Sequence, residues 1–276
     1  MIRIISDSST LYTIEEGKQL NIDIAPLSVT INNETYREYE DITQEEFYEL
    51  IKQGHLPTSS QPPVGLYLEL FEKYQDDDII VICMADGLSG TYQSCVGAKA
   101  ITKRDNIHVI NSKTLCIPHR QMVNEAVKMR DSGATLDEIL THLETLIEST
   151  QSFLLPQDFD YLKRGGRLTP LAAKLSGLIK IQPVLMQTKD GMRLERFAVS
   201  RSFNSAVKKV LDHFETSGVT ENTTFGISHA FAEKQAHMIA EKIKERFNTI
   251  KVEIEELSCA FITQGGPLCV AIQKLS

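Results

Sequence analysis

Short apolar runs in the first half of the chain alternate with polar loops and amphipathic stretches. The runs cover residues 2–5, 79–84 and 107–110. Because they are short and apolar throughout, they are typical of strands buried on both faces of a mainly parallel sheet. We therefore expect residues 1–150 to form a three-layer α/β domain, with helices on both faces of the sheet.

The pattern changes after a helix predicted over residues 135–150, whose apolar residues recur at helical spacing. Thr135 and Glu138 are placed to form the capping box of this helix. The rest of the chain, residues 151–276, predicts a second α/β domain in which helices back a mixed sheet. One of its strands is expected after an Asp190–Gly191 turn. A piece of this second half could still belong to the first domain.

The length and charge of the chain limit the classes of protein to which it can belong. Its 276 residues are enough for two domains, since domains usually contain about 100–200 residues. A formal net charge of -8 argues against a nucleic-acid-binding surface, which needs clustered Lys and Arg. No apolar stretch approaches the ~20 residues of a membrane helix. The N-terminus turns polar after five residues, so it is not expected to be a secretory signal.

The cysteines favour a reducing compartment. There are five of them, an odd number, and none forms a CxxC pair. Cys83, Cys259 and Cys269 lie in apolar runs that look like strands, so we interpret them as reduced core residues of a cytoplasmic protein. No two His, Cys or Asp residues stand at metal-ligand spacing with a third nearby, so no metal site is expected.

Loops rich in serine and aspartate follow each of the three apolar runs. They are SDSST (6–10), ADGLSGT (85–91) and NSKT (111–114). The carboxyl ends of parallel strands meet at one edge of a sheet, and ligands of such sheets bind there. We therefore expect the site of the first domain at this edge.

Ser89, within ADGLSGT, has two possible roles. A nucleophilic serine on a strained turn needs the frame G-x-S-x-G, whereas here the second glycine, Gly90, comes one position early. A catalytic serine also needs a histidine base. His229, at the end of a predicted strand, is the only reasonable candidate, because His55 and His119 are expected in loops without an evident partner. A serine esterase or acyltransferase using Ser89 is the alternative interpretation.

As a binding group, Ser89 would lie with Thr91 at the start of a helix, where unpaired backbone N–H groups favour an anion. It could equally be no more than the N-cap of that helix. The loop PTSSQPP (57–63) is stiffened by its three prolines and carries the hydroxyl groups of Thr58, Ser59 and Ser60. It could present a donor, or it could simply be a connection.

Two glycine-rich segments of the second half leave further alternatives open. KRGGR (163–167) is either a solvated loop or a turn with an arginine that reaches a carboxylate or a phosphate. TQGGP (263–267) lies between two predicted strands and resembles half of a phosphate-binding loop, but no Lys-Ser/Thr pair follows it. A nucleotide or phosphosugar kinase is therefore a third possibility.

Taken together, short motifs along the chain resemble the DegV family of bacterial fatty-acid-binding proteins, which includes the carrier subunits of fatty acid kinase. The motifs extend over nearly the whole chain, and their order makes the resemblance specific. They are SDSS (6–9), IAPLSVTIN (24–32), TSSQPP (58–63), GLSGTYQS (87–94), NSKT (111–114), YLKRGGRL (161–168), LIKIQPVL (178–185), SRS (200–202) and ISHA (227–230).

The resemblance implies two α/β domains with a narrow apolar tunnel between them. One long-chain fatty acid would lie in the tunnel, with its carboxyl group held at the interdomain edge by Ser59, Ser89 and Arg167. The family commonly adds a histidine from the last glycine-rich loop. That position is Gln264 here, which can donate a hydrogen bond but cannot take up a proton or carry a charge. The resemblance implies no catalytic residue and no cofactor.

The resemblance also implies partners. Arg201 corresponds to the basic residue that is linked, in these carriers, to engagement of the kinase and of the membrane surface. We therefore expect a non-catalytic cytoplasmic carrier that presents its fatty acid to a fatty acid kinase for phospholipid synthesis. Apolar residues near the predicted interface either line the tunnel or simply fill a core. They are Leu27, Val29, Ile31, Leu154, Leu155, Leu171, Leu175, Leu178, Ile179, Leu185 and Met186.

Overall fold

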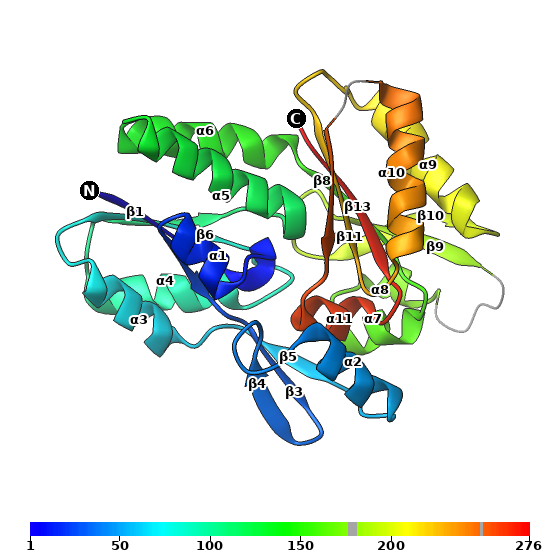
Figure 1. Cartoon of the computed structure of the whole chain (residues 1–276), viewed down its shortest axis with the longest axis horizontal. Helices are drawn as coiled ribbons and strands as arrows, with labels where there is room; N and C mark the ends of the chain where they lie inside the picture. Colours follow the sequence, from blue (N-terminus) through cyan, green and yellow to red (C-terminus); the bar gives the residue numbers. More distant parts are fainter. Residues whose placement is uncertain (176–180, 249–250) are drawn as a thin grey trace. The chain divides into compact units, whose positions relative to one another are not determined.

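The computed structural model describes residues 1–175, 181–248 and 251–276. The chain divides into two compact units, which can be followed along the colour bar of Figure 1. The first contains Met1–Glu148 and Ser258–Ala260, and the second contains Ser149–Leu257 and Phe261–Ser276. A tripeptide from near the end of the chain thus groups with the first unit.

The main sheet of the first unit has four parallel strands in the order β2-β1-β6-β7. They are β1 (Ile2–Asp7), β2 (Ile22–Ala25), β6 (Asp78–Cys83) and β7 (Ile107–Asn111). A short 3-10 helix, η1 (Ser8–Thr10), follows β1, and α1 (Ile14–Gln19) leads into β2. The three predicted apolar runs are therefore strands of one parallel sheet, as their continuous hydrophobicity indicated.

Helices cover both faces of this sheet. Along β6, alternate residues such as Val81 and Cys83 enter a core with Tyr67 and Phe71 of α3 (Val64–Lys73) and Cys95 of α4 (Thr91–Thr102). The helix α5 (Cys116–Asp131) packs against β1, and Figure 1 shows it with α6 (Leu136–Ser149) on the side away from α3 and α4. The predicted three-layer arrangement is confirmed.

A second, three-stranded antiparallel sheet in the first unit was not predicted from the sequence. Its order is β4-β3-β5, with β3 (Ser28–Ile31), β4 (Glu34–Arg37) and β5 (Thr58–Ser60), and α2 (Gln44–Lys52) lies between β4 and β5 in the chain. Asn32 and Asn33 join β3 to β4 with φ values of 51° and 62°, as a type I′ hairpin turn requires. Because Ser59 pairs with Val29, this sheet fixes the start of the proline-rich loop.

The second unit is a six-stranded mixed sheet in the order β10-β9-β8-β13-β11-β12. Its strands are β8 (Gln151–Leu155), β9 (Gln182–Gln187), β10 (Leu194–Ser200), β11 (Thr224–His229), β12 (Lys251–Glu256) and β13 (Val270–Leu275). Only β11 and β12 pair in parallel among these described strands. Two long helices, α9 (Phe203–Thr216) and α10 (Glu233–Phe247), contribute apolar residues to one core with the sheet, so the prediction of a helix-backed mixed sheet is confirmed.

Local signals in the sequence are borne out. The backbone N–H of Thr135 donates to Glu138 Oε2 at 2.8 Å, and that of Glu138 donates to Thr135 Oγ1 at 3.4 Å, which is the predicted capping box of α6. Gly191, with a φ of 75°, forms the predicted turn, where the N–H of Thr188 donates to the carbonyl of Arg193 at 2.8 Å. Both features depend on residues close together in the chain.

Two assignments made from the sequence are wrong. Cys259 begins a short helix, α11 (Cys259–Gly265), rather than lying in a strand, because a short apolar run does not by itself distinguish helix from strand. TQGGP does lie between β12 and β13, but its first three residues end α11. His119 lies in α5 and is fully buried, not in a loop without partners. All five cysteines are buried thiols.

Candidate functional site

The three Ser/Asp-rich loops lie at one edge of the first unit's parallel sheet. They follow β1, β6 and β7, and β6 pairs in parallel with both of the other strands. The expectation that they share the carboxyl edge is therefore confirmed. They differ in exposure, because Ser6–Thr10 is completely buried whereas Asp86–Gly90 is partly accessible.

The buried loop is held by the side chain of Asp7, the last residue of β1. Its Oδ1 accepts a hydrogen bond from the N–H of Ser9 at 3.0 Å, and its Oδ2 accepts one from the N–H of Met84 at 2.9 Å. A buried carboxylate is tolerated when its oxygens accept such bonds. Asp7 therefore fastens the turn after β1 to the residue that follows β6.

Ser89 lies at the entrance to α4. Its Oγ is 2.8 Å from Thr91 Oγ1 and accepts a hydrogen bond from the N–H of Thr91 at 3.3 Å. Gly90, the N-cap residue, makes no side-chain cap. Ser89 therefore does satisfy the first amide of the helix, as the N-capping interpretation supposed. Either hydroxyl group of this pair can be the donor, and Ser89 keeps a proton for a ligand when Thr91 donates.

The proline-rich loop approaches the loop that carries Ser89. A Cβ atom added to Gly90 would stand 3.0 Å from Cδ and 3.1 Å from Nε2 of Gln61. Gln61 is two residues beyond Ser59, and Ser59 is itself half-buried. The first unit thus brings together the two segments from which its predicted carboxyl-binding hydroxyl groups come. Glycine at position 90 permits this close approach.

The second unit brings its two predicted carboxyl-binding residues, Arg167 and Gln264, to one turn. The turn follows α7 (Phe159–Gly165), whose C-cap residue is Gly166 with a φ of 70°. A Cβ atom on Gly165 would stand 2.2 Å from Gln264 Oε1, and the guanidinium of Arg167 donates to the carbonyl of the same Gly165. Gln264, from α11, and Arg167 therefore flank a single glycine.

The electrostatics of this turn favour an anion. Arg167 is half-buried, and burial lowers the pKa of its guanidinium, with a further lowering from the nearby positive charge of Arg193. Arg193 donates to the carbonyl of Gly166 at 2.7 Å and so stays near the turn. A carboxylate beside Arg167 would offset both effects, since it would replace lost hydration and oppose the repulsion between the two cations.

The remaining predicted residues lie elsewhere in the second unit. Arg201 is exposed and directly precedes Ser202, whose side chain caps α9. His229, the base considered for a serine esterase, is the last residue of β11. Its Nδ1 accepts a hydrogen bond from the N–H of Ala232 at 3.3 Å, and burial lowers its pKa.

The residues considered for the tunnel wall are in varied surroundings. Leu178 and Ile179 lie outside the residues that the structure describes. Leu171 is 63% exposed. Those that are buried within their own units are Leu27, Val29, Ile31, Leu155, Leu175 and Leu185, while Leu154 and Met186 are partly buried.

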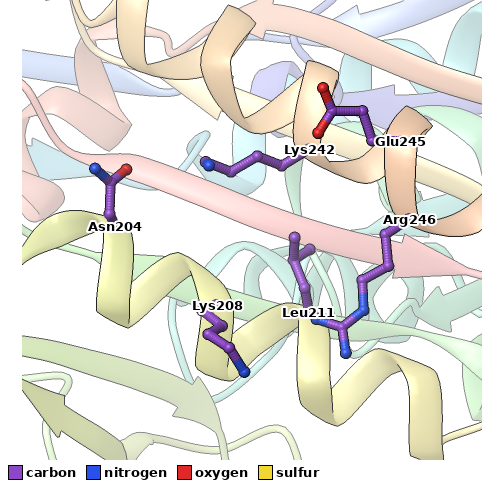
Figure 2. A pocket seen from close by; sticks show the side chains of 6 residues that line it. All are labelled: Asn204, Lys208, Leu211, Lys242, Glu245 and Arg246. Carbon is purple, nitrogen blue, oxygen red and sulfur yellow. The ribbon is translucent and has the colours of Figure 1, made fainter.

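A hollow of about 430 Å³ lies between α9 and α10. Figure 2 shows the side chains that line it, which are Asn204, Lys208, Leu211, Lys242, Glu245 and Arg246. Its charges are largely compensated, because Lys208 and Arg246 both donate to Asp212, at 2.8 Å and 2.7 Å. A second hollow of about 360 Å³ takes in Leu175 together with polar residues of segment 156–160. Neither hollow is lined by the predicted carboxyl-binding residues.

The described residues lack two features, a cluster of metal-ligand side chains and a helix suited to a membrane. In segments 1–175, 181–248 and 251–276, no three His, Cys, Asp or Glu side chains gather as metal ligands would. Over the same segments, none of the helices combines the length and the hydrophobicity needed to cross a bilayer.

Glu38 is a buried carboxyl group of the first unit that was not predicted from the sequence. It is 1% exposed, accepts a hydrogen bond from the hydroxyl group of Ser8, and accepts another from the N–H of Ala260 at 2.9 Å. Burial raises its pKa to about 7, although the hydrogen bonds act in the opposite direction. Its place in the polar stretch YREYED carries no signal of burial, because Ala260 is 222 residues away.

Comparisons with known proteins agree with this architecture. A family model described as "Uncharacterised protein, DegV family" matches residues 1–276. A DegV domain-containing protein of Halalkalibacterium halodurans is 30% identical, over 96% of this chain and 95% of its own. DegV of Bacillus subtilis, whose crystal structure is described as that of a fatty acid binding protein, is 26% identical with a TM-score of 0.86, covering 99% of this chain and 98% of that one. A fatty-acid-binding DegV family protein from Thermus thermophilus has the same fold, with a TM-score of 0.90 at 23% identity, covering 100% of this chain and 99% of that one. The chain belongs to the DegV family.

Proposed function

We propose that this protein binds one long-chain fatty acid and acts as a non-catalytic cytoplasmic carrier. The observation that carries the proposal is the pairing of the predicted polar groups. One unit joins the segments of Ser59 and Ser89 through Gln61 and Gly90, and the other joins Arg167 and Gln264 at Gly165. Membership of the family supports the same ligand class, since the Bacillus subtilis relative is described as a fatty acid binding protein.

In this proposal the four polar residues hold the carboxylate and the apolar tunnel predicted from the resemblance holds the tail. Hydrogen bonds to a charged group contribute about 1.5–3 kcal/mol each. Each buried methylene contributes about 0.8 kcal/mol, so a long acyl chain supplies most of the affinity. The carboxylate contacts select an acid over an uncharged lipid of the same length, because only the acid offers a charge to Arg167.

The carrier role extends the proposal to partners. The exposed Arg201 would contact a fatty acid kinase and, transiently, a membrane surface. Gln264 offers a donor where the family resemblance implies a histidine, so it would bind a carboxylate without exchanging a proton. The absence of a titratable group at this position therefore affects lipid binding less than it affects presentation of the lipid to a kinase.

Mass spectrometry of the lipid that copurifies with the protein tests the ligand class. We expect a long-chain fatty acid in wild-type protein and about tenfold or greater loss of fatty acid affinity in Ser89→Ala, because one charge-assisted hydrogen bond is removed. Protein that is consistently empty and also ignores added fatty acid would contradict the proposal. Covalent labelling of Ser89 by a fluorophosphonate, absent in Ser89→Ala, would instead support the esterase.

Two substitutions that each remove one positive charge test the proposed role of Arg201 in contacting a partner. Arg201→Ala should keep its fatty acid affinity and lose phosphorylation of the bound acid by a fatty acid kinase. Lys234→Ala, which removes an exposed cation from α10, is the matched control and should keep both. Loss of lipid binding in Arg201→Ala would show that this residue belongs to the lipid site instead.

A further inference from the structure

A buried polar network lies beneath the loop that carries Ser89. Its members come from β1, η1 and α5, and Ser6, Asp7, Ser9 and His119 are all 0% exposed. His119 is 110 residues from Ser9, so the network exists only in the folded chain. Its contacts converge on Ile82, within β6, and on Met84, the residue between β6 and the Ser89 loop.

The hydrogen bonds determine which nitrogen of His119 carries the proton. Nε2 lies 3.0 Å from the carbonyl oxygen of Ile82, which can only accept, so Nε2 is the protonated nitrogen. Nδ1, 2.8 Å from Ser9 Oγ, is then the acceptor of the serine proton. Burial lowers the pKa of His119, against smaller opposite effects of Asp7 and of the hydrogen bond to Ile82.

The network fastens the strand end at successive residues. Ser6 Oγ donates to the carbonyl of Ile82 at 2.7 Å, and Asp7 Oδ2 accepts from the N–H of Met84 at 2.9 Å. The loop after β7 continues the attachment, because the carbonyl of Thr114 accepts from the N–H of Ala85 at 2.9 Å. Beyond this point a turn follows, in which the N–H of Leu88 donates to the carbonyl of Ala85 at 3.1 Å, and Ser89 comes next.

A network of buried polar groups stabilises a core less efficiently than apolar packing does. Apolar side chains of similar volume would fill the same space without desolvating a carboxylate and an imidazole, and such replacements are often neutral or stabilising. A polar network does provide directional attachment, which apolar packing does not. A half-buried hydroxyl group that must meet a carboxylate within hydrogen-bonding distance benefits from that attachment.

We propose that Asp7 and His119, with Ser6 and Ser9, are positioning residues that set the Ser89 hydroxyl group for carboxylate binding. The inference rests on the proposed function, since it assigns these residues a role in selecting the acid head group. None of them touches the ligand. They act through the backbone of residues 82–86.

The test compares two probes that differ only in the head group, stearic acid and stearyl alcohol. Asp7→Asn keeps the size of the side chain but leaves one oxygen to accept two N–H bonds. We expect about tenfold weaker binding of stearic acid and unchanged binding of the alcohol, because one carboxylate contact is misplaced. In the double variant with Ser89→Ala, Asp7→Asn should cause no further loss, since the contact that it positions is already gone.

Two further variants keep the test informative if Asp7→Asn does not fold. Ser9→Ala removes the hydroxyl group that bonds to His119 Nδ1, and the same selective loss of acid binding is expected. Ser228→Ala, a buried serine of the second unit whose Oγ donates to Gln273 at 3.4 Å, is the matched control and should bind both probes normally.

Equal losses for the acid and the alcohol, or losses that add to that of Ser89→Ala, would overturn the inference and leave a purely structural role. Unchanged acid binding in both Asp7→Asn and Ser9→Ala would overturn it as well. These outcomes are distinct from failure of the proposed function, in which wild-type protein itself would not bind stearic acid.

Discussion

Two serine-rich loops leave neighbouring strands of one sheet, and the fold uses them in opposite ways. The loop after β1, Ser6–Thr10, is fully buried and its side chains bond to the protein itself. The loop after β6, Ala85–Gly90, is partly accessible beyond its first residue, and Ser89 there forms hydrogen bonds with the neighbouring Thr91. The first loop supports the fold, whereas the second loop leaves the Ser89 hydroxyl group accessible.

The difference follows from what covers each loop. His119 of α5 bonds to Ser6 and Ser9, and Glu38 bonds to Ser8, so the first loop is enclosed by elements that supply its partners. Gln61, the described neighbour of Gly90, is exposed. Composition and position in the sheet are therefore insufficient to recognise a binding loop, because the surrounding elements decide whether a serine is satisfied internally.

The largest effect on stability is expected from removing the side chain of Asp7, which holds the buried loop in place. Asp7→Ala leaves the buried N–H groups of Ser9 and Met84 without an acceptor, and each such group costs about 1–3 kcal/mol. We expect the free energy of unfolding to fall by roughly 2–6 kcal/mol, measured by urea denaturation. A loss below about 1 kcal/mol would mean that the buried network does not hold the fold.

A second prediction concerns pH, since Glu38 bonds to the buried loop. Its pKa is raised from 4.5 to about 7, so the folded protein binds a proton there that the unfolded chain has released. Its contribution to stability is fully present below pH 4.5 and is lost as the pH rises through about 7. From the size of the shift, this loss is on the order of 3 kcal/mol.

Glu38→Gln should remove that part of the pH dependence, because the amide does not ionise. Urea denaturation of both proteins at several pH values between the two pKa values measures it. Parallel curves for wild type and Glu38→Gln would show that Glu38 does not titrate in this range.

The smallest effect on stability is expected from a substitution in the loop after β6, which carries Ser89. Ser89→Ala removes a hydrogen bond to Thr91 at a partly accessible position, so the free energy of unfolding should change by less than about 1 kcal/mol. The same denaturation experiment as for Asp7→Ala measures it. A loss as large as that of Asp7→Ala would abolish the distinction between the two loops.

The sequence predicted one of these loops better than the other. The position of both loops at the carboxyl edge followed from three apolar runs with polar residues after them, and Ser89 was correctly placed at a helix start. The burial of Ser6–Thr10 was not predictable, because its partners His119 and Glu38 are 110 and 30 residues away. For the same reason His119 was assigned to a loop without partners.

By itself the sequence determined the parallel and mixed sheets, the capping box at Thr135 and Glu138, the turn at Gly191 and membership of the family. The sheets, the capping box and the turn depend on periodicity or on residues within a few positions of one another, which short-range backbone preferences encode. Membership of the family depends instead on the order of short motifs along nearly the whole chain. Only the tertiary structure decided that Glu38 is buried against Ala260, that Gln264 meets Gly165, and that one serine-rich loop is enclosed while its neighbour is not. The physical reason is that the cost of burying a polar group depends on partners brought in from distant parts of the chain, and no local pattern records them.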